Sequence, residues 1–281
     1  MPDNDDSRKV PVSVIIPCYN CSETINLTVE SVIKQTRLPE ELFLINDASP
    51  DNGRTMAALN LLRDRLGSII DIHVINFEEN KGPAFARNAG WEAASKPYIA
   101  FLDADDFWHP QKLELINNVI EQNPHIDLIG HDFCLAKDHQ DIKRLYSTAC
   151  SSRIVRKRFY SILLLNPFVT PSFFLKKNIR QRMNPHLRYC EDHEFLLRVA
   201  HSCNVYYLKL KLVQLGREPF AEGGLTAKRL LMRKGEIMMY LEALKYRHVL
   251  LLLLPLLILF SMIKHLILLG LPYLQRKTVK P

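Results

Sequence analysis

Near residue 100, three carboxylates directly follow an apolar run. The run Tyr98-Ile-Ala-Phe-Leu102 is rich in strand-forming residues and leads into Asp103-Ala-Asp-Asp106, which predicts a buried strand with an acidic cluster at its carboxyl end. Residues two apart in extended backbone point the same way, so the carboxylates of Asp103 and Asp105 can converge. A divalent cation shared with a phosphate-bearing ligand would offset their repulsion. The alternative is a strand end followed by an Asp-rich cap of the helix predicted from Pro110.

A second acidic pair, Glu191 and Asp192, opens an amphipathic helix later in the chain. These carboxylates can either serve in catalysis or interact with the helix dipole, which favours acidic side chains in the first turn. His193 follows the pair directly, and Trp108 lies close to the first acidic cluster. We expect both to be packing residues, with substrate contact as the alternative for Trp108.

The segments that must position these side chains alternate between strand and helix patterns. Predicted strands at residues 12–16, 41–45, 69–75 and 98–102 are separated by helical patterns, of which 54–66 is the longest. Such alternation predicts an α/β fold with a parallel sheet, whose ligands bind at the carboxyl ends of the strands. The region has no GxGxxG motif, which disfavours a dinucleotide-binding fold.

Composition adds a charge asymmetry to an otherwise ordinary globular profile. The 281 residues are 47% hydrophobic and 24% charged, with a net charge of +7. Residues 142–190 contain no Asp or Glu but many Lys and Arg residues. This basic region predicts an anionic partner: a membrane surface, a phosphorylated acceptor or nucleic acid.

The cysteines and the N-terminus indicate a cytoplasmic catalytic part. Six cysteines show no framework spacing, and Cys18-x-x-Cys21 resembles half a zinc site without a second half, so we expect reduced thiols. Residues 1–9 are polar and acidic, which predicts no secretory signal.

Five motifs in order give the chain a specific resemblance. Over roughly residues 10–200 it resembles the family-2 glycosyltransferases with the GT-A fold, a Rossmann-like fold with a mainly parallel central sheet flanked by helices. The motifs are Val12-Ser-Val-Ile-Ile-Pro-Cys-Tyr-Asn20, Ile45-Asn-Asp-Ala-Ser-Pro-Asp-Asn52, Asn80-x-Gly-x-x-x-Ala-Arg-Asn-x-Gly90, Phe101-Leu-Asp-Ala-Asp-Asp106 and Glu191-Asp192.

The resemblance implies transfer from a nucleotide-diphospho-sugar with inversion at the sugar carbon. It implies that Asp105, together with Asp103, binds Mn²⁺ or Mg²⁺ at the diphosphate, and that Asp103 also faces the ribose or sugar. It implies Asp192 as the general base, with Glu191 beside it. This assignment agrees with the chemistry, since a cation stabilises the leaving diphosphate and a carboxylate takes the acceptor's proton.

The resemblance also implies a nucleotide pocket. Asp47 would hydrogen-bond the base, and Arg87 would lie near the base and diphosphate. Asn46 stands where the family often has Asp, so we expect an altered base contact. The other residues that would line the pocket are Pro17, Tyr19, Asn20 and Glu23.

The C-terminal part is strongly apolar. Residues 249–274 could span a bilayer, but Lys264 would then lie near its centre at a cost of about 3 kcal/mol. Basic residues flank both ends. We therefore expect an interfacial or re-entrant anchor, broken near Pro255 or Lys264, in preference to a span or a buried oligomerisation helix. This divides the chain into a glycosyltransferase domain (1–245) and a membrane-associating segment (246–281).

These features predict a metal-dependent inverting glycosyltransferase at the cytoplasmic face of the inner or plasma membrane. It would move a hexose, with UDP as the expected carrier, to a glycan or lipid-linked acceptor in surface polysaccharide or lipopolysaccharide assembly, with no nucleic acid partner. Three alternatives remain: a polyprenyl-phosphate glycosyltransferase, a nucleotidyltransferase, and a catalytically silent membrane protein that binds sugar nucleotides.

Overall fold

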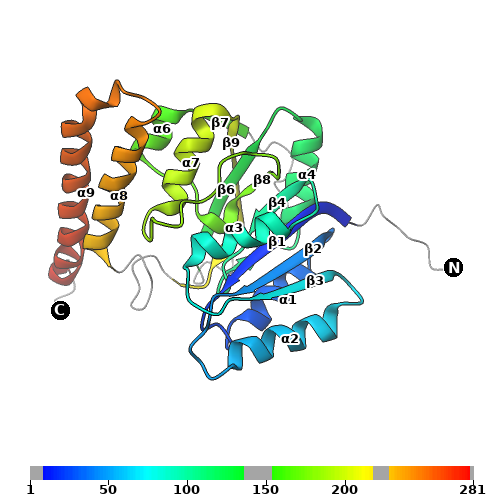
Figure 1. Cartoon of the computed structure of the whole chain (residues 1–281). Coiled ribbons are helices and arrows are strands. Elements are labelled where there is room, and N and C mark those ends of the chain that lie inside the picture. Colours follow the sequence, from blue (N-terminus) through cyan, green and yellow to red (C-terminus); the bar gives the residue numbers. More distant parts are fainter. Residues whose placement is uncertain (1–8, 136–153, 218–227, 279–281) are drawn as a thin grey trace.

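A central nine-stranded sheet organises the described part of the chain in the computed structural model (Figure 1). The structure describes residues 9–135, 154–217 and 228–278. The strand order is β3-β2-β1-β4-β8-β6-β9-β5, and β7 pairs with β9 outside this path. Helices cover both faces of the sheet.

The N-terminal half is parallel, as predicted. The strands β1 (Lys9–Cys18), β2 (Leu38–Asn46), β3 (Asp71–Asn76) and β4 (Tyr98–Phe101) lie side by side. Helices α1 (Ile25–Ile33), α2 (Arg54–Leu66) and α3 (Pro83–Ala93) connect them. The chain leaves β1 toward β2 on one side and returns to β4 on the other, so the neighbouring ends of β1 and β4 form a switch point where ligands bind in such sheets.

The second half corrects the expectation of a mainly parallel sheet. β8 (Phe174–Lys176) lies antiparallel between β4 and β6 (Leu128–Leu135), and β5 (Phe107–Trp108) and β7 (Ile154–Lys157) pair antiparallel with β9 (Val205–Leu215). Only β6 and β9 are parallel to each other in this half. The sequence did not predict β5, β7 and β8, which are short and pair antiparallel with strands from distant parts of the chain.

The two faces of the sheet carry separate hydrophobic layers. Because side chains alternate along β1, Val14 and Ile16 face α1, α2 and α4 (Lys112–Gln122), whereas Ile15 faces α3 and α7 (Glu191–Ser202). Gly90 of α3 lies so close to β1 that a Cβ there would be 2.6 Å from Ile15 Cγ2. This close approach accounts for the glycine at that position of the third motif.

Two long helices cover α7 on its outer side. Figure 1 shows α8 (Arg229–Leu244) and α9 (Leu250–Thr278) as a helical hairpin at the edge of the molecule. The predicted break near Pro255 or Lys264 is wrong, because α9 continues through both residues. The inner residues Leu250 and Leu257 belong to the same buried layer as α7. Within the described residues, no helix combines the length and the apolarity that crossing a membrane requires.

The basic region is only partly described. Its residues 142–153 lie outside the described residues, including Lys143, Arg144 and Arg153. Two of its described cations have acidic partners from other elements, since Lys176 pairs with Asp127 at 3.0 Å and Arg182 with Glu92 at 2.6 Å. The excess positive charge of this region is therefore smaller in the fold than in the sequence.

Candidate active site

The acidic cluster lies at the carboxyl end of β4, as the sequence predicts. Each of its carboxylates is held by a different donor: Asp103 Oδ1 lies 2.5 Å from Arg87 Nη2, Asp105 Oδ2 lies 3.0 Å from Arg217 Nε, and Asp106 Oδ1 accepts the Gly216 N–H at 2.9 Å. The loop itself is fixed to α1, because Thr28 donates to the carbonyl of Ala104 at 3.0 Å.

The cluster holds more negative charge than its partners neutralise. Burial and the charge of Asp103 raise the pKa of Asp105, despite Arg217. Burial, followed by the charge of Asp103, raises the pKa of Asp106 to about 8. Ionised carboxylates that repel in a partly buried site favour binding of a cation.

The donor set suits a hard divalent cation. Carboxylate oxygens are the ligands that Mg²⁺ and Mn²⁺ prefer, and Mg²⁺ in such sites is usually held by one or two carboxylates together with substrate phosphates. Asp105 fits that arrangement, because its partner Arg217 is 55% exposed and easily displaced. Asp103 is more tightly engaged, through the buried Arg87.

A tighter group of potential ligand atoms lies elsewhere. Within the described residues, Glu41, Asp71 and His73 form the only such group, with ligand atoms within 4.8 Å of one another. Asp71 begins β3 and Glu41 lies early in β2, away from the carboxyl ends of these strands. Glu41 already accepts hydrogen bonds from Ser13 at 2.6 Å and from the Ser95 backbone at 3.0 Å, so we assign this group to structure.

Arg87 links the two acidic motifs. Its guanidinium is buried, with Nη2 on Asp103 and Nη1 3.6 Å from Glu191 Oε1. Burial opposes its charge, but Asp103 and Glu191 outweigh burial and raise the pKa of Arg87. Residues 87, 103 and 191 are thus brought together by one ion-pair chain from α3, the loop after β4 and α7.

The predicted base lies in the first turn of α7. Asp192 Oδ2 accepts a hydrogen bond from Asn166 Nδ2 at 3.0 Å, which fixes one carboxylate oxygen, and the role of Asp192 as the base stays a prediction. Its neighbour Glu191 is buried, and burial together with the charge of Asp192 raises the pKa of Glu191 to about 7, although Arg87 opposes this. His193 is turned away into the core, with Nε2 2.5 Å from the Ile162 carbonyl.

Asp47 links the loop after β2 to the loop before α3. Its carboxylate accepts the backbone N–H groups of Lys81 at 2.7 Å and Gly82 at 2.8 Å, and the Asn80 side chain at 2.9 Å. Asn46 donates to Asn76 at 2.6 Å. Both residues therefore fix the ends of β2 and β3 and the loop before α3, and the contact of Asp47 with the base remains a prediction.

The remaining predicted nucleotide residues lie at the end of β1. Pro17 is half-buried, whereas Tyr19, Asn20 and Glu23 are exposed. Asn20 has a left-handed backbone, with φ of 52°, and its N–H donates to Ser49 Oγ at 2.9 Å. The turn thus presents its side chains at the switch point, and their contact with a nucleotide is a prediction.

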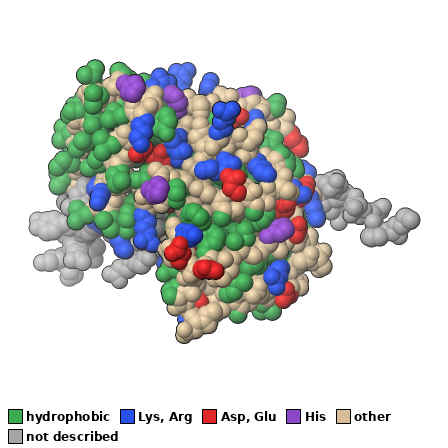
Figure 2. Space-filling model, in the orientation of Figure 1, with side chains coloured by type: hydrophobic (Ala, Val, Ile, Leu, Met, Phe, Trp, Pro, Cys, Tyr) green, Lys and Arg blue, Asp and Glu red, His purple; other side chains and the backbone are tan. Residues whose placement is uncertain are grey.

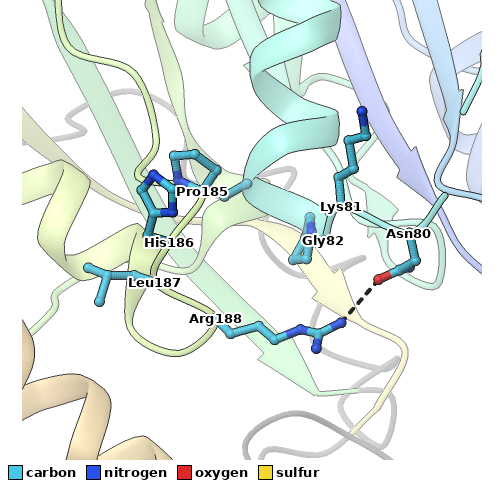
Figure 3. Close-up of a pocket in the computed structure, with 9 residues that line it drawn as sticks. Asn80, Lys81, Gly82, Pro185, His186, Leu187 and Arg188 are labelled. Carbon is cyan, nitrogen blue, oxygen red and sulfur yellow. Dashed lines mark hydrogen bonds between the residues drawn. The ribbon is translucent and has the colours of Figure 1, made fainter.

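A hollow of about 260 Å³ lies beside the loop before α3, which Asp47 holds (Figure 3). One wall is formed by residues 80–84 and the other by residues 185–188. Arg188 bridges the two walls, because its guanidinium donates to Asn80 Oδ1 at 3.0 Å. The second wall was not predicted from the sequence. Its only sequence signal is Arg188, a basic residue shortly before Glu191.

The sequence also did not predict that Gly216 and Arg217, which follow β9, contact the acidic cluster. A Cβ on Gly216 would lie 1.8 Å from the backbone oxygen of Asp105. Only glycine permits this approach, which brings its N–H to Asp106 and Arg217 to Asp105. A glycine after a strand is too common a pattern to indicate this contact.

Replacing Gly216 with alanine should disrupt the acidic cluster. The new methyl group must displace either the end of β9 or the backbone of Asp105, and such overpacking destabilises by about 1–3 kcal/mol. We expect a lower melting temperature together with at least a tenfold weaker affinity for UDP in the presence of Mg²⁺. Unchanged UDP affinity in calorimetry would show that this contact does not position the cluster.

Replacing Glu191 with glutamine should make stability less dependent on pH. The folded pKa of about 7 lies above the ordinary glutamate value of about 4.5, so the unfolded state binds fewer protons between these two pH values and the free energy of unfolding falls as pH rises through this window. As the pH rises from 4.5 to 8, the free energy of unfolding of E191Q should therefore increase relative to that of the parent by up to about 3 kcal/mol. Urea unfolding at several pH values measures this difference. Parallel curves for parent and E191Q, like those expected for the exposed control E78Q, would contradict it.

Comparison with known families places these motifs in one group. The model of the family described as "Glycosyl transferase family 2" matches residues 13–200. A curated relative from Escherichia coli, the UDP-Glc:alpha-D-GlcNAc-diphosphoundecaprenol beta-1,3-glucosyltransferase WfgD, is 33% identical over 173 residues, which cover 57% of this chain and 64% of that protein. The first curated relatives are matched over 39–64% of their own length.

Solved structures agree on the fold. S. aureus TarS 1–349 in complex with UDP-GlcNAc aligns with a TM-score of 0.64 at 18% identity, over 83% of this chain and 66% of that one. The mannosyltransferase PcManGT from Pyrobaculum calidifontis, in complex with GDP-Man and Mn²⁺, aligns with a TM-score of 0.62 at 16% identity, over 90% of this chain and 73% of that one. At these identities the likeness establishes the fold alone.

Proposed function

The chain belongs to glycosyl transferase family 2 and is a GT-A glycosyltransferase, and from this premise we propose that it transfers a hexose from a UDP-linked donor to a lipid-linked glycan with inversion. The observation that carries the proposal is the ion-pair chain Asp103–Arg87–Glu191. It joins the carboxylates proposed for the donor to the helix that carries the proposed base.

The choice of donor and acceptor rests on the relatives. WfgD is named for UDP-Glc and a diphosphoundecaprenol-linked acceptor, and TarS was solved with UDP-GlcNAc. We extend UDP as the carrier and a lipid-linked acceptor to this chain. Transfer to a polyprenyl phosphate remains the alternative within the fold, whereas a nucleotidyltransferase or a silent binding protein has no support from the relatives.

On the donor side, we propose that Asp105 and Asp103 hold Mn²⁺ or Mg²⁺ at the donor diphosphate. The ion would neutralise negative charge that develops on the leaving diphosphate. Arg87 fixes Asp103, and the Gly216 N–H fixes Asp106. Pro17, Tyr19, Asn20 and Glu23 would line the nucleotide pocket above the loop that Asp47 holds.

On the acceptor side, we propose that a free carboxylate oxygen of Asp192 takes the proton of the attacking hydroxyl. Asn166 orients this carboxylate through its hydrogen bond. Glu191 directly precedes Asp192 in α7 and pairs with Arg87, so its protonation state changes the charge next to the proposed base. The proton transfer then accompanies formation of the new C–O bond as the bond to the diphosphate breaks.

We propose that the enzyme works at the cytoplasmic face of the inner or plasma membrane, in surface polysaccharide or lipopolysaccharide assembly. Residues 1–245 would carry the transfer reaction, and residues 246–281 with the basic region would contact the membrane. A lipid-linked acceptor requires such proximity.

A panel of nucleotide sugars tests the proposed donor class. Purified protein with Mg²⁺ or Mn²⁺ should release UDP from at least one UDP-hexose, by slow transfer to water, and should be stabilised thermally by UDP more than by GDP. Release of nucleoside monophosphate or pyrophosphate would instead indicate nucleotidyl transfer.

A further inference from the structure

Ser261 and Lys264, the polar residues of α9 whose side chains the structure describes, face inward. Ser261, which is 1% exposed, donates to Glu236 Oε2 of α8 at 2.5 Å, and Lys264 pairs with the other carboxylate oxygen. Glu236 is itself buried and also pairs with Arg233. This buried polar cluster of Arg233, Glu236, Ser261 and Lys264 fixes how α9 is rotated against α8.

The opposite side of the hairpin is apolar and exposed. Figure 2 shows hydrophobic side chains gathered over the edge formed by α8 and α9. On α9, Leu252 is 80% exposed and Leu256 63%, and Leu230 on α8 is 74% exposed. From Leu250 to Ile263 α9 carries no charged residue. An apolar face of this extent on a described surface marks an interaction site.

Cations and aromatic rings border this face at the turn between the helices. Tyr246 and Arg247 are exposed there, and the Arg247 guanidinium lies 5.9 Å from the ring of Tyr160 on α6 (Phe159–Leu164). On α6 and just beyond it, Tyr160, Leu164 and Leu165 are also exposed. The acid Glu242 at this end pairs with Lys245. Apolar side chains bordered by tyrosine and basic residues suit the interface of an anionic leaflet.

The same helices contact the residues around the proposed base. Cys190 Sγ lies 3.5 Å from the Met232 carbonyl of α8, and a Cβ on Gly235 would lie 2.6 Å from the Tyr189 carbonyl. Asn166, which orients Asp192, directly follows the exposed Leu165. The apolar face and the start of α7 thus belong to one packed unit.

We propose that α6, α8 and α9 form a single lipid-docking surface that lies in the plane of an anionic leaflet. The buried polar cluster turns Lys264 away from the lipid, so α9 lies along the interface and α8 shares the contact. Docking through this unit brings Asp192 to the membrane surface; this last step rests on the proposed function, whereas the docking itself does not.

Vesicle flotation of the full chain tests the docking surface. The parent should float with vesicles of phosphatidylcholine containing 30% phosphatidylglycerol, as a direct consequence of the anionic leaflet attracting the basic border. The double variant L252E/L256E should lose at least 90% of the floating fraction. The matched control is L61E on α2, which changes an equally exposed leucine remote from the hairpin and should float like the parent.

Two further readouts separate the possible outcomes. Water should hydrolyse the donor at the same rate in L252E/L256E and in the parent, which would show that the active site is intact. Loss of flotation with hydrolysis retained therefore supports the docking surface independently of the acceptor. Parental flotation of the double variant overturns the proposal. So does a parent that stays off the vesicles and forms a dimer in light scattering that L252E/L256E dissociates, because the face would then bind a second copy.

Discussion

Replacing Asp105 with asparagine should lower kcat/KM by about 10³-fold, the loss typical of removing one group that stabilises charge in a transition state. This variant should separate an effect on metal binding from an effect on stability. Burial and the charge of Asp103 raise the pKa of Asp105, so a neutral side chain relieves repulsion in the fold. Its exposed partner Arg217 loses an ion pair worth only about 0–1 kcal/mol.

Activity and stability should therefore change independently in D105N. We expect a melting temperature equal to or above that of the parent, while calorimetry shows UDP binding that no longer strengthens when Mg²⁺ or Mn²⁺ is added. D64N, which alters an exposed carboxylate on α2, serves as the matched control and should retain the metal effect. Metal-dependent UDP binding of parental strength in D105N would place the ion elsewhere.

Replacing Asp192 with asparagine should reduce kcat by about 10²–10⁴-fold, the range expected for loss of general base catalysis. The amide is similar in shape and can still accept the hydrogen bond from Asn166, so α7 should keep its position. Because Asp192 does not contact the donor cluster directly, the affinity for UDP with metal should be unchanged. The effect should thus fall on kcat alone.

The contrast between two neighbouring carboxylates sharpens this test. Burial and the charge of Asp192 raise the pKa of Glu191, so E191Q should change the pH dependence of stability, whereas D192N should lower turnover. Near-parental turnover of D192N under saturating donor would mean that another group takes the proton. Weakened UDP binding in D192N would instead indicate that its effect reaches the donor site through Arg87.

Much of the N-terminal fold followed from local sequence patterns. The helix predicted at 54–66 coincides with α2, and the four parallel strands overlap the predicted strands at 12–16, 41–45, 69–75 and 98–102. Periodicity is a local property, and these elements are long enough to show it. The antiparallel insertion of β8, with only three residues, depends on contacts across the sheet that no local pattern records.

The candidate site shows the same division. Asp103, Arg87 and Glu191 lie within motifs and are joined by ion pairs, but Gly216 and Arg217 reach the cluster from more than a hundred positions away. The break expected near Lys264 failed for a similar reason. A lysine in an apolar helix is unfavourable alone, yet Glu236 on α8 provides a buried partner for it.

The central claim is metal-dependent transfer with inversion, assisted by Asp192. It is tested most directly by following hydrolysis of an α-linked UDP-hexose with ¹H NMR in the presence of Mg²⁺, where water replaces the acceptor. The account predicts that the β-anomer of the free sugar appears first, before mutarotation, and that its release is lost in D192N and in D105N. First appearance of the α-anomer, or release that persists in both variants, would contradict it.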